Sequence, residues 1–312
     1  MSDAFTIRPI KTLEECRQVE DLQRRAWDID EVDVAPVHVL LTVAKNGGVL
    51  LGAFAPAGER EQMVGFVFGF LGTREGHYGP EAPAAVKLKH CSHMMGVLPD
   101  WQSRGVGYAL KLAQREAARA QALRLITWTY DPLESRNANL NIAKLGAVCN
   151  TYLPNLYGEL RDGLNRGLPT DRFQVDWWIA SKRVQTRLSR QRPPLTRDLY
   201  QQAGTPLLNE AAFAASGLPV PPDSIRPLDG DRALVEFPAL FQDVKRIDPA
   251  LALAWRMHTR AIFETAFVSG FTIIDMLYDR GPMPRSFYVL TRTEPGEKDE
   301  GGRMKTNEHG AH

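Results

Sequence analysis

The sequence has few cysteines, no long apolar run and no excess of charge of one sign. Three cysteines, Cys16, Cys91 and Cys149, occur in 312 residues. Because they are far apart and odd in number, we expect no disulfide framework and a reducing compartment. The longest nearly uncharged apolar run, residues 63–72, is far shorter than the ~20 residues that a membrane-spanning helix needs. The 38 basic and 37 acidic residues leave a net charge of +1, which argues against a nucleic-acid-binding protein.

The N-terminal segment also lacks the apolar stretch of an export signal, since the chain begins MSDAFTIRPIKTLEE. We therefore expect a cytoplasmic protein without a membrane partner. At 312 residues, with 44% hydrophobic and 24% charged residues, the chain is long enough to bury a core without a disulfide or a metal. Length alone allows one large domain or two smaller ones.

Strand-like and helix-like segments alternate over about the first 180 residues. Thr12 and Glu15 form a capping box at the start of the first helix. In a helix at 105–121, Lys111, Arg115 and Arg119 recur at i, i+4 spacing on a face other than the apolar one. Strands are expected at 5–10, 49–55, 63–71, 85–98, 125–130 and 173–181, and helices from residue 12 and at 37–45, 105–121 and 137–145. This order predicts an α/β fold with a mixed central sheet flanked by helices on both faces.

Composition changes along the chain predict four segments. They are a first domain at 1–181, a Pro-rich connector at 182–224 with one helix around 207–216, a C-terminal α/β subdomain at 225–292, and a disordered charged tail at 293–312. The C-terminal subdomain is a β-α-β-β extension with strands at 233–237, 271–278 and 286–291 and a helix from Asp248-Pro249. Since so small a sheet is marginal alone, we expect this subdomain to pack onto the first domain or onto a partner subunit.

The most informative segment is VLPDWQSRGVGYAL at residues 97–110, where a strand ends, a tight turn follows and a helix begins. Gly105 and Gly107 allow the main chain to approach a bulky anion because they have no Cβ atom. The first helical turn offers N–H groups and the positive end of the helix dipole, and Arg104 adds a charge-assisted contact. A phosphate-binding turn is therefore expected. A tight β-α turn without a ligand is the alternative.

This strand, turn and helix resemble the coenzyme A-binding motif of the GNAT acetyltransferase superfamily, whose pattern is Gln/Arg-x-x-Gly-x-Gly/Ala and which is represented here by Gln102, Gly105 and Gly107. Residues 137–147, NANLNIAKLGA, resemble the second signature of that superfamily. The likeness covers about residues 5–181. It implies a GNAT-like acyl-CoA N-acyltransferase fold and acetyl-CoA or another acyl-CoA as cosubstrate, with no metal. It also implies direct transfer of the acyl group to an amine of a small molecule or protein.

The resemblance also implies which residues bind the coenzyme. The main chain of Val97 and Leu98 would pair with the pantetheine amides, and Asn137 or Asn139 would reach the coenzyme arm. The pyrophosphate would be held by the turn and the first helical residues: Gln102, Ser103, Arg104, Gly105, Val106, Gly107 and Tyr108.

The catalytic residues are less well defined by the sequence. Many family members have a Tyr that is proposed to protonate the coenzyme thiolate, and alignment on the second signature places Ile142 there. We take Tyr157 as the candidate acid, with Tyr130 and Tyr152 as alternatives. His93 and Glu134 are the candidate bases, beside His90 and Asp131. A histidine that is hydrogen-bonded within the sheet is the structural alternative for His90 and His93.

Two other functions remain open at this point. The chain could bind or sense acyl-CoA without chemistry, or serve as a scaffold. The C-terminal subdomain has no Gln-x-x-Gly-x-Gly turn, so we expect no second coenzyme there. A degenerate GNAT-like half that walls the acceptor site or forms a homodimer contact is one interpretation of this subdomain.

Overall fold

The computed structural model describes residues 5–27, 29, 31–74, 82–83, 87–158, 167–189, 193 and 195–292. Contacts divide the chain into two compact units, Met1–Thr129 with Asn155–Thr170, and Tyr130–Pro154 with Asp171–His312. This division cuts the chain at Thr129, whereas the sequence predicts boundaries at residues 181 and 224. The tail predicted at 293–312 lies outside the described residues.

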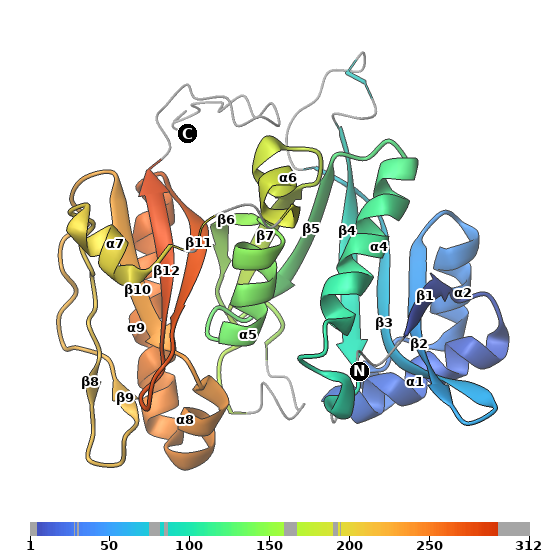
Figure 1. Ribbon diagram of the computed structural model, residues 1–312, viewed down its shortest axis with the longest axis horizontal. Coiled ribbons are helices and arrows are strands. Elements are labelled where there is room, and N and C mark those ends of the chain that lie inside the picture. Colours follow the sequence, from blue (N-terminus) through green and yellow to red (C-terminus); the bar gives the residue numbers. More distant parts are fainter. Residues whose placement is uncertain are drawn as a thin grey trace. The chain divides into compact units, whose positions relative to one another are not determined.

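The first unit is built around a five-stranded stretch of sheet in the order β1-β2-β3-β4-β5, with helices labelled in Figure 1. Its elements are β1 (Thr6–Pro9), α1 (Leu13–Trp27), η1 (Glu31–Asp33), α2 (Val37–Lys45), β2 (Val49–Ala57), β3 (Arg60–Thr73), β4 (Leu88–Val97), η2 (Pro99–Trp101), α4 (Val106–Ala120) and β5 (Leu125–Tyr130). Neighbours from β1 to β4 are antiparallel, and β5 is parallel to β4.

Alternating side chains give this sheet an apolar core on each face. On one face Phe66 and Phe68 pack with residues of α1 and α2, among them Leu40. On the other face Val67 packs with Leu110 of α4. The expected capping box starts α1, because Glu15 N–H donates to Thr12 Oγ1 and Thr12 N–H donates to Glu15 Oε2, each at 3.1 Å. The predicted mixed sheet with helices on both faces is confirmed.

The second unit has its own sheet stretch in the order β7-β6-β11-β12-β10. Its elements are α5 (Ser135–Ala138), the π-helix η3 (Asn139–Lys144), β6 (Val148–Leu153), β7 (Arg172–Trp178), α6 (Lys182–Leu188), α7 (Arg197–Gln202), β8 (Ala212–Phe213), β9 (Pro219–Val220), β10 (Arg232–Pro238), α8 (Phe241–Ile247), α9 (Pro249–Val268), β11 (Phe271–Asp279) and β12 (Arg285–Arg292). The predicted β-α-β-β order of the C-terminal subdomain is confirmed in β10, α9, β11 and β12.

An aromatic cluster joins the C-terminal subdomain to β7 within this second unit. Phe173 of β7 contacts Phe263 of α9 at 4.8 Å and Tyr288 of β12 at 5.4 Å between ring centroids. All three residues are fully buried. The hydroxyls of Tyr288 and Tyr130 are 3.1 Å apart, and Cys149 of β6 pairs with Ile273 of β11. The subdomain therefore packs onto residues that the sequence assigns to the first domain, as predicted.

The segment predicted as a connector is folded against the second unit. Leu207 and Leu208 are buried, and main-chain hydrogen bonds join Leu208 N–H to Leu234 O and Leu234 N–H to Pro206 O. The prediction of a helix around residues 207–216 is wrong, because Leu207 pairs with Leu234 of β10 and the segment then forms β8. Apolar side chains in the segment make the prolines part of a packed edge and not of a free linker.

These contacts predict that the first 181 residues do not form a stable fragment. Ending the chain at Ser181 removes Phe263, which contacts Phe173, and Tyr288, which contacts both Phe173 and Tyr130, and it exposes β6 along the edge that pairs with β11. Such a fragment should aggregate, or bind a hydrophobic dye and unfold without a cooperative transition, in light scattering and thermal unfolding. A soluble, monomeric fragment with a sharp transition would contradict the packing described here.

Candidate coenzyme and acyl-transfer site

The turn between β4 and α4 has the backbone of an anion-binding loop. Ser103 has a φ of 63° and Gly105 a φ of 87°, both in the left-handed region. Gln102 stabilises the turn by donating from Nε2 to Val97 O at 3.2 Å. Gly105 is the N-cap of α4 and supplies no side-chain cap to its first turn. The first-turn N–H groups of a helix have no acceptor within the helix, so this turn suits an anionic ligand.

Gly105 also borders open space. Apart from its two neighbours in the chain, a Cβ atom built on Gly105 would meet no atom of the described residues within 4 Å, and any other residue would be strained at this φ. Beside it, the guanidinium of Arg104 lies 5.4 Å from the centre of the Trp101 ring. The turn therefore combines a main chain that borders open space with a cation, and the phosphate site stays a prediction.

The second feature of the site is the point where β4 and β5 part. Their register joins His90 to Ile126 and Cys91 to Thr127. Beyond these two pairs β4 continues to Val97, where its strand partner among the described residues is β3, while β5 continues to Tyr130. An unpaired strand edge is a template for an extended chain with amide groups.

A β-bulge lies at this same point. Met94 pairs with Phe68 and Ser92 with Gly69, so His93 is an extra residue in β4. A bulge changes which way the following side chains point. Met94 packs with the core on the α1 and α2 face, whereas Met95 packs with the core on the α4 face. The bulge thus adds a residue to β4 where it leaves β5.

His93 and His90 have different surroundings. His93 is accessible to solvent, and its ring centroid lies 6.0 Å from that of Phe68 and 5.8 Å from that of Phe70. The part of the imidazole that is buried lowers the pKa of His93. His90 is fully buried, and burial together with the charge of Lys111 lowers its pKa to about 4. Gln114 Nε2 lies 3.1 Å from His90 Nε2. His90 is therefore the histidine held neutral within the sheet, and His93 is the accessible one.

Lys111 was expected on a face away from the apolar side of its helix, and that prediction is wrong. Lys111 is 2% exposed. Its Nζ donates to Ser92 Oγ at 2.7 Å and to Gln114 Oε1 at 3.3 Å, and it lies 3.7 Å from the centre of the Trp128 ring. Burial lowers the pKa of Lys111 to about 7. The missed signal is the i, i+3, i+7 spacing of Lys111, Gln114 and Ala118 on the buried face.

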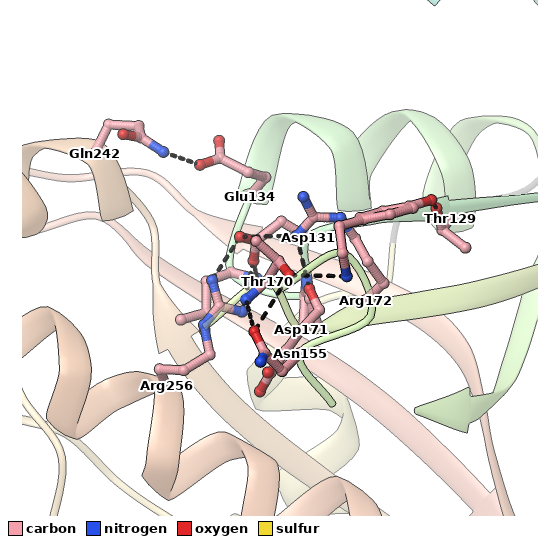
Figure 2. Close-up of polar contacts among 12 residues, drawn as sticks. Thr129, Asp131, Glu134, Asn155, Thr170, Asp171, Arg172, Gln242 and Arg256 are labelled. Carbon is pink, nitrogen blue, oxygen red and sulfur yellow. Dashed lines mark hydrogen bonds and ion pairs between the residues drawn. The ribbon is translucent and has the colours of Figure 1, made fainter. Parts of the chain in front are cut away.

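Tyr157, the candidate acid, belongs to the first unit. Its hydroxyl lies 2.9 Å from Thr129 Oγ1, two residues beyond the last β4–β5 pair, and the side chain is 48% exposed. Thr170 Oγ1 accepts from Tyr157 N–H at 3.0 Å, and Thr170 is itself bonded to Asn155 (Figure 2). These bonds hold Tyr157 at the free end of β5. The alternatives Tyr130 and Tyr152 belong to the second unit, where burial raises the pKa of both.

Glu134, the candidate carboxylate base, lies in the second unit, four residues after Tyr130. Gln242 of α8 donates from Nε2 to Glu134 Oε1, and burial and the charge of Asp131 raise the pKa of Glu134 (Figure 2). Asp131 instead accepts two hydrogen bonds from Arg256 of α9, at 2.9 and 2.5 Å. Asp131 therefore forms an ion pair with Arg256, whereas Glu134 is the carboxylate whose pKa is raised.

The residues of the second signature also lie in the second unit. Asn137 is exposed in α5, and Asn139 is half-buried at the start of η3. Ile142, at the position of the family's Tyr, is fully buried. The predicted single helix at 137–145 is one turn of α-helix followed by a π-helix, a feature often found at functional sites.

Two further observations bear on the type of site. Within the part of the chain that the structure describes, Cys16, Cys91 and Cys149 are free thiols, and no three His, Cys, Asp or Glu side chains are grouped as metal ligands. No helix among the described residues is long and apolar enough to cross a membrane.

Comparison with known proteins finds similarity in three-dimensional structure. No family model and no curated protein matches the chain. The acetyl-CoA complex of Arabidopsis thaliana NAA60 is 17% identical, with a TM-score of 0.46, and its match covers 57% of this chain and 100% of that one. The ribosomal-protein-S18-alanine N-acetyltransferase from Escherichia coli is 14% identical, with a TM-score of 0.41 and coverage of 57% and 96%. An acetyltransferase of the GNAT family from Streptococcus pneumoniae is 15% identical, with a TM-score of 0.41 and coverage of 55% and 98%.

These solved structures belong to the superfamily that the sequence resembles. At such identities and TM-scores the likeness concerns the course of the chain over little more than half of its length. The chemistry of the site has to be argued from this chain's own residues.

The burial of Lys111 predicts a pH dependence of stability. Folded Lys111 loses its proton near pH 7, whereas in the unfolded chain it keeps the proton to about pH 10.5. Between these values the unfolded chain binds more protons, so stability rises with pH. The free energy of unfolding of the unmodified protein should rise relative to that of Lys111→Met by up to about 1.4 kcal/mol per pH unit between pH 7 and 9.

Urea unfolding at several pH values measures this difference. Arg119→Met is the matched control, because Arg119 lies two helical turns further along α4 with a half-exposed side chain. It should follow the unmodified protein. Parallel curves for the unmodified protein and Lys111→Met would show that Lys111 keeps an ordinary pKa.

Proposed function

We propose that the protein is an acyl-CoA-dependent N-acyltransferase, using acetyl-CoA as the simplest donor, that transfers the acyl group directly to an amine of a small molecule or protein. One observation carries the proposal. A single strand, β4, leaves its neighbour β5 after Cys91 and ends in the glycine turn that starts α4. One end of the strand thus suits a pyrophosphate, and its open edge suits an extended arm with amide groups.

The coenzyme residues follow from this arrangement. Residues 102–108 would hold the pyrophosphate through main-chain N–H groups, with Arg104 as the cation. Val97 and Leu98 would offer main-chain groups to the pantetheine. The Val97 carbonyl already accepts from Gln102, and a carbonyl oxygen has a second lone pair for another donor. Asn137 and Asn139 are proposed from the sequence resemblance alone.

The chemistry requires a group that removes a proton from the attacking amine. His93 is the first choice, because its ring is accessible and its lowered pKa keeps it neutral at pH 7. It is also the bulged residue at the point where β4 leaves β5. Glu134 is the alternative, since a raised pKa makes a carboxylate a stronger base. Tyr157, the candidate acid from the sequence, is held by Thr129 at the free end of β5.

A second function is supported by a specific observation. The position at which the family has a proton-donating Tyr is here the fully buried Ile142. A protein that binds acyl-CoA without transferring its acyl group would have no need of this donor. Thiol release from acetyl-CoA in the presence of a panel of amines separates the two functions, because only the transferase releases thiol.

The first test of coenzyme binding replaces Gly105. Gly105→Val fills the open space before the turn and strains its backbone, so the main-chain donors can no longer approach a phosphate. Loss of charged hydrogen bonds worth about 1.5–3 kcal/mol each should weaken acyl-CoA binding at least about tenfold in calorimetry.

The matched control for this variant is Gly47→Val. Gly47 follows α2 with a φ of 85° and also borders open space. Gly47→Val therefore causes the same backbone strain away from the turn between β4 and α4. It should lose a similar amount of stability and keep its affinity for acyl-CoA. If folded Gly105→Val binds acyl-CoA as tightly as the Gly47→Val control, the turn is not the phosphate site.

The second test identifies the base from the pH dependence of the rate. A neutral histidine is required for proton removal, so kcat should fall as the pH drops through the pKa of His93, below its ordinary value of 6.5. His93→Ala should lower kcat more than it raises KM for acyl-CoA, and it should abolish this fall. If the fall persists in His93→Ala and disappears in Glu134→Gln, Glu134 is the base.

A further inference from the structure

The amine of Lys111 lies where β4 and β5 part. Ser92 is the first residue of β4 beyond the last pair with β5, and Trp128 is the first residue of β5 beyond that pair. Lys111 Nζ is 2.7 Å from Ser92 Oγ and 3.7 Å from the centre of the Trp128 ring. A buried amine therefore contacts the first residue of each strand beyond the last pair, on the α4 face of the sheet.

Within the part of the chain that the structure describes, no acidic side chain contacts the amine of Lys111. Its neighbours on α4, β4 and β5 are Gln114, Ser92 and Trp128, which offer two oxygen acceptors and an aromatic face. Cys91 and His90 are the nearby titratable groups on β4. Burial raises the pKa of the Cys91 thiol and lowers that of His90, so both are neutral at pH 7. An ammonium at this position can stabilise a negative charge that develops where β4 and β5 part.

His90 sets the orientation of the Gln114 amide, which contacts Lys111. Gln114 Nε2 donates to His90 Nε2, so Gln114 Oε1 is turned toward Lys111. His90 Nδ1 has no hydrogen-bond partner among the described residues. The buried histidine thus orients Gln114, and Gln114 together with Ser92 orients the amine.

We propose that Lys111, acting through the Ser92 hydroxyl, supplies the proton that the leaving coenzyme thiolate takes up. The inference rests on the proposed function, and it provides a donor in a chain that has Ile142 where the family has Tyr. Lys111 is a positioning residue that supplies the proton through Ser92, to which its amine donates a hydrogen bond. Its pKa of about 7 lies below that of an ordinary thiol, so proton transfer from Lys111 to a thiolate is downhill.

The step balances in atoms and charge. The amine nitrogen bonds to the thioester carbon, and its proton goes to the base. When the carbon–sulfur bond breaks, its electron pair stays on sulfur. Sulfur takes the hydrogen of the Ser92 hydroxyl, and Ser92 Oγ takes a proton from Lys111 Nζ. Before the next cycle the base releases its proton to solvent and the neutral amine of Lys111 takes one up, so the net products are an amide and the coenzyme thiol.

The test measures acyl-CoA affinity, kcat and the pH profile of kcat in matched variants. Lys111→Met keeps most of the unbranched side chain and removes the ammonium group that carries the proton. It should bind acyl-CoA within about twofold of the unmodified protein and lower kcat about 100-fold, as expected for loss of an acid. It should also abolish the loss of activity that the unmodified protein shows as the pH rises above 7. Ser92→Ala should have the same effects, and Arg119→Met should have none.

Two results would overturn the inference. One is a folded Lys111→Met or Ser92→Ala protein that keeps kcat within twofold and keeps the alkaline loss of activity. The other is a Tyr157→Phe protein that alone abolishes that loss, which would make Tyr157 the donor. If the unmodified protein itself binds no acyl-CoA or releases no thiol, the proposed function fails, and this outcome is distinct from both.

Discussion

The parting of β4 from β5 is the constraint on which the proposed site depends. A parallel pair that ends after two residues leaves main-chain groups of β4 with no strand partner on one edge among the residues described. Unpaired groups of this kind are costly when buried, so a ligand with amides that can pair with them binds favourably. The bulge at His93 lies at the same point. It adds a residue to β4 beside the open edge, between Ser92 on the α4 side and Met94 on the opposite side.

The two faces of β4 are chemically different at this point. His93 is accessible, next to the rings of Phe68 and Phe70. Ser92 faces α4, and its hydroxyl oxygen accepts a hydrogen bond from the amine of Lys111. An acyl transfer needs a proton removed from the attacking amine and a charge stabilised on the leaving thiolate. His93 offers a proton acceptor, and the adjacent Ser92 contacts the buried amine of Lys111 on α4, so the two needs are served on different faces of β4.

The sequence predicts the parts of this site that depend on local pattern. The glycine turn, the strand before it and the helix after it follow from Gln102, Gly105 and Gly107, and the order of the C-terminal subdomain follows from apolar spacing. The bulge does not, because one extra residue in β4 shows only against the register of β3. Lys111 was misassigned because spacing to Arg115 and Arg119 favours a solvated face. Strand β6 is not predicted, because it is short, comes soon after the π-helix and pairs non-locally with β7 and β11.

Hydrogen exchange at the main-chain amides of β4 and α4 measures the central claim most directly. Acetyl-CoA should slow exchange both in the first turn of α4 and at residues 92–97 of β4, because the pyrophosphate and the pantetheine would occupy these two places. ADP, which has a pyrophosphate and no pantetheine, should slow exchange in the first turn of α4 alone. Unchanged exchange at residues 92–97 with saturating acetyl-CoA would contradict the account, because the open edge of β4 would then not be where the coenzyme binds.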